Sequence, residues 1–158
     1  MTRQRFDDHS TEFGLWIRNQ PVLGSVNFDC QNLDYIWFAY RDGWLITIEE
    51  KRYNGKSSLA QNDTHNLIKQ MLEFASGQEY QTLRGKRSIH YKGHYLIQFE
   101  NTNPEDGWIK INGEIVTKNE LTLFLYSGQF VKVENQSTSE LAKEANISID
   151  IARQIRNV

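Results

Sequence analysis

Two alternating apolar runs joined by an Asp-Gly dipeptide constrain the fold of this chain more than any other feature. They occupy residues 32–53, NLDYIWFAYRDGWLITIEEKRY, on either side of Asp42-Gly43. That dipeptide favours a two-residue turn between antiparallel strands. Such a turn pairs Arg41 with Trp44, so the stretch predicts a β-hairpin with a defined register.

The register decides which charged side chains share a face of the hairpin. Continued from the turn, the pairing places Asp34 opposite Lys51, with Glu49 two residues before Lys51. Opposed residues lie on one face, and so do residues two apart on one strand. We therefore expect Asp34, Glu49 and Lys51 on one face. Glu50 and Arg52 belong to the other face unless the register slips by one residue.

The composition is that of a folded, soluble protein. Of 158 residues, 39% are hydrophobic and 24% are charged, which suits one domain with a real core. The net charge of -2 excludes a uniformly basic protein that coats nucleic acid, but it leaves room for a local basic groove. A single cysteine, Cys30, excludes an internal disulfide and a cysteine-based zinc site. Without a long apolar segment, the chain is expected to be cytoplasmic.

The regions around the hairpin predict an α/β (α+β) fold with a mixed central sheet flanked by helices. Ser10 or Thr11 can cap a first helix, and Asn62 or Asp63 can cap a second, in which Leu67, Met71 and their neighbours recur at helical spacing. The predicted order is helix, three strands, helix and strand, over residues 10–20, 22–28, 33–40, 44–53, 63–76 and 94–100.

The remainder of the chain predicts a second hairpin and three short helices. Asn112-Gly113 is again the favoured turn dipeptide, and residues 120–126 have helical spacing. Residues 137–158 read as two helices with a joint at residues 146–148. The expected caps are Ser139 and Ser148, and the expected seam consists of Leu141, Ala145, Ile147, Ile151 and Ile155.

This last segment resembles the core of a helix-turn-helix, whose second helix can enter a major groove. A docked or dimerising helical pair is the alternative. Two helices alone cannot bury a stable core, so the segment must dock on another part of the chain or on a partner. We therefore divide the chain into a domain of residues 1–126 and a helical tail of residues 127–158.

Two carboxylates and a lysine on one face can support phosphoryl chemistry. Asp34 and Glu49 can ligate a divalent cation such as Mg²⁺ through oxygen, and the Glu50 carbonyl or Glu12 can add a further oxygen. Such an ion polarises a phosphoryl oxygen and acidifies a bound water. Lys51 can position that water, deprotonate it, or neutralise charge on the phosphate. The alternative is a solvated strand end with weak ion pairs, with Glu12 serving its helix dipole.

With its flanking helices, this pattern resembles the PD-(D/E)XK nuclease superfamily. Asp34, the Glu49-Glu50-Lys51 run and Glu12 carry the resemblance, which covers residues 10–100, although Leu33 stands where the name has proline. The aromatic hairpin is also similar to the cyanobacterial intron-encoded homing endonucleases of this superfamily. The resemblance implies Mg²⁺-dependent cleavage of double-stranded DNA by a homo-oligomer, a dimer or tetramer. It also implies a supporting role near the site for Gln61, which otherwise reads as a loop amide.

A basic stretch beyond the second predicted helix suits DNA phosphates. Its cations are Arg84, Lys86, Arg87 and Lys92. Lysine and arginine provide affinity and register on DNA, whereas base contacts provide specificity. An ordinary solvated loop is the alternative for this stretch, and His65 reads as a surface or core residue. We expect a Mg²⁺-dependent DNA endonuclease, with homing, restriction or repair roles open, and a DNA-binding regulator acting through residues 137–158 as the rival.

Overall fold

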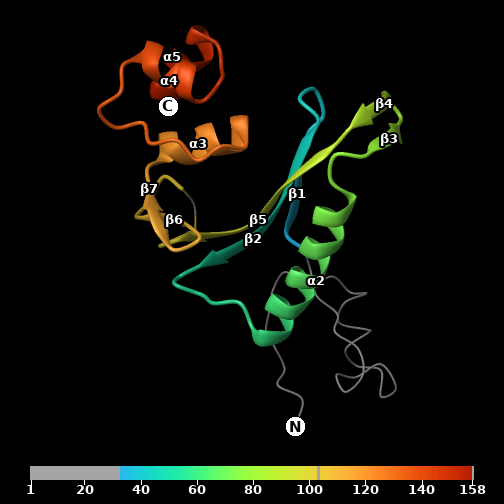
Figure 1. Cartoon of the computed structure of the whole chain (residues 1–158). Coiled ribbons are helices and arrows are strands. Elements are labelled where there is room, and N and C mark those ends of the chain that lie inside the picture. Colours follow the sequence, from blue (N-terminus) through green and yellow to red (C-terminus); the bar gives the residue numbers. More distant parts are fainter. Residues whose placement is uncertain (1–32, 103, 158) are drawn as a thin grey trace, which may run out of the picture. The chain divides into compact units, whose positions relative to one another are not determined.

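The computed structural model describes residues 33–102 and 104–157, which belong to one compact unit of the chain, residues 32–158 (Figure 1). The helix expected over residues 10–20, the strand expected over residues 22–28, and the candidate Glu12 all lie outside the described residues.

A five-stranded mixed sheet forms the centre of the described unit, in the order β1-β2-β5-β6-β7. Strand β2 pairs antiparallel with β1 and parallel with β5. A parallel pair needs a long crossover connection, and helix α2 lies in that connection. The strands are β1 (Tyr35–Ala39), β2 (Trp44–Arg52), β5 (His90–Phe99), β6 (Ile109–Ile111) and β7 (Glu114–Val116). The predicted mixed α/β fold is confirmed.

Four helices accompany the sheet among the described residues: α2 (Leu59–Ala75), α3 (Lys118–Ser127), α4 (Thr138–Glu144) and α5 (Ile149–Arg156). Helix α2 begins earlier than expected because Ser58, and neither Asn62 nor Asp63, caps it in a capping box with Gln61. Gln61 is therefore in the first turn of the helix, and both the predicted helix start at residue 63 and the interpretation of Gln61 as a loop amide were wrong. Ser137 caps α4 in place of Ser139.

The hairpin of β1 and β2 exists, but its predicted register was wrong by two residues. Ala39 pairs with Trp44, so the connection is residues 40–43 rather than Asp42-Gly43 alone. Gly43 ends this longer loop at φ 70°, and its amide donates to the Ala39 carbonyl. A shift of two residues leaves every side chain on its original face, whereas a shift of one would reverse it.

The two faces of β2 differ in chemistry and in what covers them. Trp44, Ile46 and Ile48 join an apolar core with Leu121 and Phe124 of α3. On the opposite face, Thr47 and Glu49 are each only 1% exposed, although both are polar. Helix α2 buries Gln61 and His65, and both of these side chains contact Glu49 on that face. Figure 1 shows α2 and α3 on different sides of the sheet.

Most of the basic stretch lies in strands, so the alternative of an ordinary solvated loop does not describe its structure. Strands β3 (Glu79–Thr82) and β4 (Gly85–Ser88) form a separate two-stranded sheet, and β5 begins at His90 rather than residue 94. The polar side chains of β3 and β4 lack the apolar alternation by which strands are recognised. The second predicted hairpin is confirmed, and Asn112 and Gly113 have the two positive φ angles, 50° and 87°, of a type I′ turn.

Candidate functional site

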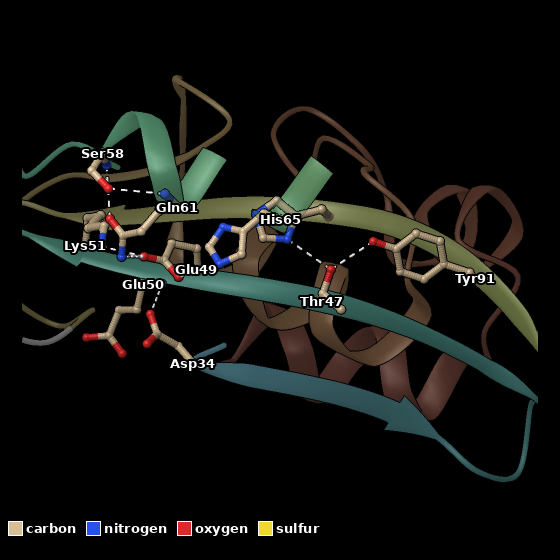
Figure 2. A network of polar contacts seen from close by, with 10 residues as sticks. Asp34, Thr47, Glu49, Glu50, Lys51, Ser58, Gln61, His65 and Tyr91 are labelled. Carbon is tan, nitrogen blue, oxygen red and sulfur yellow. Dashed lines mark hydrogen bonds and ion pairs between the residues drawn. The ribbon is translucent and has the colours of Figure 1, made fainter. Parts of the chain in front are cut away.

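The carboxylate of Glu49 is the centre of a buried polar cluster under α2. Its Oε1 forms an ion pair with Lys51 Nζ and accepts a hydrogen bond of 3.1 Å from Gln61 Nε2. Lys51 remains 19% exposed, whereas Glu49 is 1% exposed. The cluster therefore joins a buried carboxylate to a partly exposed cation. Figure 2 shows Lys51 and Gln61 beside Glu49.

The start of α2 orients Gln61 toward this carboxylate. Gln61 Oε1 accepts a hydrogen bond of 3.0 Å from the Ser58 backbone amide, and the Ser58 hydroxyl accepts from the Gln61 amide at 3.2 Å. Because the side-chain oxygen is used for the cap, the Nε2 group is the end that points at Glu49. The same two residues thus cap the helix and hold one oxygen of the carboxylate.

The other oxygen of Glu49, Oε2, accepts no hydrogen bond from the described residues. Within residues 33–102 and 104–157, neither Glu49 Oε2 nor His65 Nε2 has a hydrogen-bond partner, and both atoms are buried. The two atoms are 3.6 Å apart. A buried polar atom without a partner costs about 1–3 kcal/mol. In a folded protein such an atom is explained by local strain, a catalytic role, or a bound water or ion.

A second row of polar groups lies behind His65. The rings of His65 and His94 are 4.7 Å apart, and Thr47 Oγ1 contacts both His94 Nδ1 at 2.9 Å and the Tyr91 hydroxyl at 2.8 Å. Burial, and then the neighbouring His65, lower the pKa of His94. His94 is therefore neutral at neutral pH. This row supports the cluster from β5, the strand next to β2.

Asp34 lies just before β1, beside the end of β2. Its Oδ2 accepts a hydrogen bond of 2.7 Å from the Glu50 backbone amide. Desolvation raises the pKa of the Asp34 carboxyl, and the charge of Glu49 raises it further, against the lowering effects of the Glu50 amide and Lys51. Asp34 thus belongs to the electrostatic neighbourhood of Glu49 and Lys51, although no direct bond joins it to either.

The side chain of Glu50 points away from the cluster. It pairs with Arg52 and accepts a hydrogen bond of 3.0 Å from the Tyr35 hydroxyl. Figure 2 shows Glu49 turned toward Gln61 and Glu50 turned to the other side of the strand. Near the Asp34 carboxylate, Glu50 therefore offers its backbone and not its side chain, as the hairpin geometry implies.

The four basic candidates have different surroundings. Arg84 stacks its guanidinium over the Tyr40 ring at 4.0 Å, and the exposed Lys86 pairs with Glu79 at 3.6 Å. Arg87 donates to the Tyr40 carbonyl at 2.8 Å. Lys92 donates to the Ser127 carbonyl at 3.2 Å, and burial lowers its pKa. Arg84 and Lys86 are therefore the more accessible pair, and a role of all four on DNA stays a prediction.

Sequence reasoning did not assign His65, His94 or Thr47 to the site. Two local signals point to them. Gln61 and His65 are one helical turn apart, and Thr47, Glu49 and Lys51 alternate along one strand face. The contact of His94 with these groups depends on the pairing of β2 with β5, which connects residues far apart in the chain.

Comparison of this chain with family models, curated proteins and solved structures finds no match in any of the three. In the described part of the chain, no group of three or more His, Cys, Asp or Glu side chains has the arrangement of a metal site. The helices of that part include none with the length and hydropathy needed to cross a membrane. The function is therefore inferred from the site's own residues.

Proposed function

We propose that this chain is a Mg²⁺-dependent endonuclease that hydrolyses phosphodiester bonds in double-stranded DNA. The observation that carries the proposal is the Glu49 carboxylate, buried at the end of β2. Lys51 pairs with one of its oxygens, and the other oxygen accepts no hydrogen bond from the described residues and lies 3.6 Å from His65 Nε2. The antiparallel hairpin, the crossover helix α2 and the parallel strand β5 follow in the order that the resemblance to PD-(D/E)XK nucleases implies.

The donor set fits a hard divalent cation. Asp34 and Glu49 offer carboxylate oxygens and Glu50 its carbonyl, and Mg²⁺ prefers oxygen ligands with water in the remaining positions. Mg²⁺, when bound, polarises a phosphoryl oxygen and lowers the pKa of bound water. Burial, and to a smaller extent the charge of Glu49, raise the pKa of Asp34, so a nearby cation would favour its ionised form. Glu12 stays a candidate for a further oxygen.

The other residues of the cluster act as a base, a charge or a support. In this proposal Lys51 orients or deprotonates an attacking water, or stabilises charge on the phosphate. Gln61 occupies Glu49 Oε1, so that Oε2 stays available. Arg84 and Lys86 on the β3–β4 hairpin supply phosphate contacts beside the sheet, with Arg87 and Lys92 as further candidates.

The described residues of one chain form one such cluster, whereas a duplex has two strands. We therefore propose a homo-oligomer, a dimer or tetramer, in which two copies each cut one strand. A homing role, with a long DNA target, is the preferred biological setting, and a restriction or repair role shares the same site. The cytoplasm is the proposed location.

The test is cleavage of a supercoiled plasmid by the purified chain with Mg²⁺ and with EDTA. We expect nicked and then linear DNA with Mg²⁺ only. Binding without cutting in the presence of Mg²⁺ or Mn²⁺, over a library of targets, would instead indicate a DNA-binding regulator. DNA cleavage at an undiminished rate in EDTA would contradict the proposed dependence on a metal ion.

A further inference from the structure

The C-terminal helices are built on a second apolar core, separate from the core under α3 and the sheet. Leu141 and Ala152 are fully buried there, with Ala145 at 1% exposure. Leu123 of α3, also fully buried, belongs to the same cluster. Helices α3, α4 and α5 therefore share one core, which removes the difficulty that two short helices cannot bury a core by themselves.

Polar contacts fix the segment between α3 and α4 onto this unit. Glu120 of α3 is 3% exposed, and its Oε1 accepts a hydrogen bond of 3.1 Å from the Val133 amide. At the other end, Arg156 of α5 donates to the Gln136 carbonyl at 2.9 Å, just before α4. The three helices are thus held by buried side chains and by contacts at both ends.

The joint between α4 and α5 is a sharp turn of the helix-turn-helix kind. Asn146 has a left-handed φ of 53°, and the Ile147 amide donates to the Ala142 carbonyl at 2.9 Å. This is the bond that closes a Schellman motif at a helix end. Ser148 then caps α5, its hydroxyl accepting from the Ile151 amide at 3.2 Å. The chain therefore leaves α4 and starts α5 within a few residues.

Helix α5 keeps one polar stripe in solvent. Its members recur at helical spacing and are all exposed: Asp150, Arg153 and Gln154 of α5, and Asn157, the C-cap residue that follows the helix. Arginine reads guanine, glutamine and asparagine read adenine, and aspartate accepts from cytosine in the major groove. The Arg153–Asp150 ion pair of 3.0 Å is exposed on both sides, so it contributes little to stability and can open for a base.

We infer that the exposed stripe of α5 binds in the major groove of double-stranded DNA and reads its sequence. In a helix-turn-helix, the second helix lies in the groove and the first crosses the backbone. The stripe of base-reading side chains lies on the second helix, and Lys143 is exposed on the first. This site is separate from the Glu49 cluster, so the inference holds whether or not the chain cuts DNA.

The experiment is selection of duplexes from a random library by the full chain in EDTA, so that no cleavage is measured. We expect the parent to enrich a defined sequence. Arg153→Ala and Gln154→Ala should each reduce preference at one position about tenfold, in the range measured for single base contacts. Both side chains are exposed, so circular dichroism should show an unchanged fold.

Arg84→Ala on the β3–β4 hairpin is the matched control. Loss of a phosphate contact should weaken binding to all sequences alike and leave the preference unchanged. Binding without sequence preference in the parent would overturn the inference. An unchanged preference in Arg153→Ala and Gln154→Ala would overturn it equally. So would sedimentation showing that the stripe holds two copies together, with the variants monomeric and no DNA bound.

Discussion

Desolvation and nearby carboxylates raise the pKa of Asp34 in the folded chain. When the pKa of a carboxyl is higher in the folded state than in the unfolded state, its protonated form stabilises the fold. This stabilisation is lost as the pH rises through the pKa of the folded state. At neutral pH the ionised Asp34 therefore works against stability unless a cation is present. The metal-free fold thus disfavours the charged form of Asp34, which is the form that would bind a metal ion.

We expect Asp34→Asn to unfold at higher urea concentration than the parent at pH 7 in EDTA. Asparagine keeps an oxygen for the Glu50 amide and removes the negative charge. The difference should shrink as the pH falls toward 4, because the parent carboxyl then becomes protonated. Added Mg²⁺ should stabilise the parent and not the variant. A less stable variant at pH 7 in EDTA would show that the Asp34 charge supports the fold.

At the scale of elements, the start of α2 connects helix stability with the site. Ser58 with Gln61 and Ser137 with Glu140 form equivalent capping boxes on α2 and α4. Only the first of them also contacts Glu49, through Gln61. Comparing variants of the two capping boxes therefore separates the effect of a lost helix cap from the effect of a disturbed site.

Ser58→Ala and Ser137→Ala should each cost about 1 kcal/mol of unfolding free energy, the usual effect of a lost N-cap. Plasmid cleavage by the Ser58 variant should slow, because Gln61 then no longer holds Glu49 Oε1 firmly. The Ser137 variant should cleave at the parental rate. Equal cleavage rates for both variants would contradict a positioning role of the α2 cap.

The two glycine turns give a second comparison between elements. A Cβ at Gly43 would lie 2.6 Å from the Ser88 carbonyl oxygen, whereas at Gly113 nothing lies within 4 Å. Both have positive φ, 70° and 87°. Gly113→Ala should therefore cost about 1–2 kcal/mol of backbone strain, and Gly43→Ala clearly more, because β4 must move. The cost of each variant is measured as the loss of unfolding free energy in urea. An equal cost, or a larger cost for Gly113→Ala, would contradict the close approach of the β1–β2 loop to β4.

The periodicity of apolar residues was sufficient to predict most helices and strands, but not the loops that connect them or the register of their pairing. The apolar alternation of β2 and the spacing in α3, α4 and α5 are local, so the sequence predicted them. The register of β1 was missed because Gly43 ends a loop longer than the dipeptide suggests. Leu67 and Met71 of α2 are exposed, since the helix instead turns Gln61 and His65 to the sheet. A polar packing face cannot be recognised from hydrophobic spacing.

The site was predictable only as far as it is local. Glu49 and Lys51 share a face because they are two apart on one strand, and a register error of two residues did not change this. The contact of Glu49 with His65 joins β2 to α2, and the contact of Thr47 with His94 depends on the β2–β5 pairing. Such contacts join residues on different elements, so the spacing of residues along the sequence does not predict them.

At the scale of the whole molecule, the proposal requires two copies on one duplex. The double variant Glu49→Gln with Lys51→Met removes both charges together, which avoids leaving a buried charge without its partner. In excess over the parent, this variant should shift plasmid products from linear to nicked circles, because mixed oligomers cut one strand. An unchanged proportion of linear product would indicate that one copy cuts both strands.

The most direct test of the account compares ion pairs on the two faces of β2. Glu49 and Lys51 form the pair in the buried cluster, and Glu50 and Arg52 form the pair on the other face. Glu49→Gln with Lys51→Met should lower the Mg²⁺-dependent cleavage rate at least about 100-fold, with DNA binding retained. Glu50→Gln with Arg52→Met should cleave like the parent. Cleavage at the parental rate by the Glu49–Lys51 double variant would contradict the proposed site.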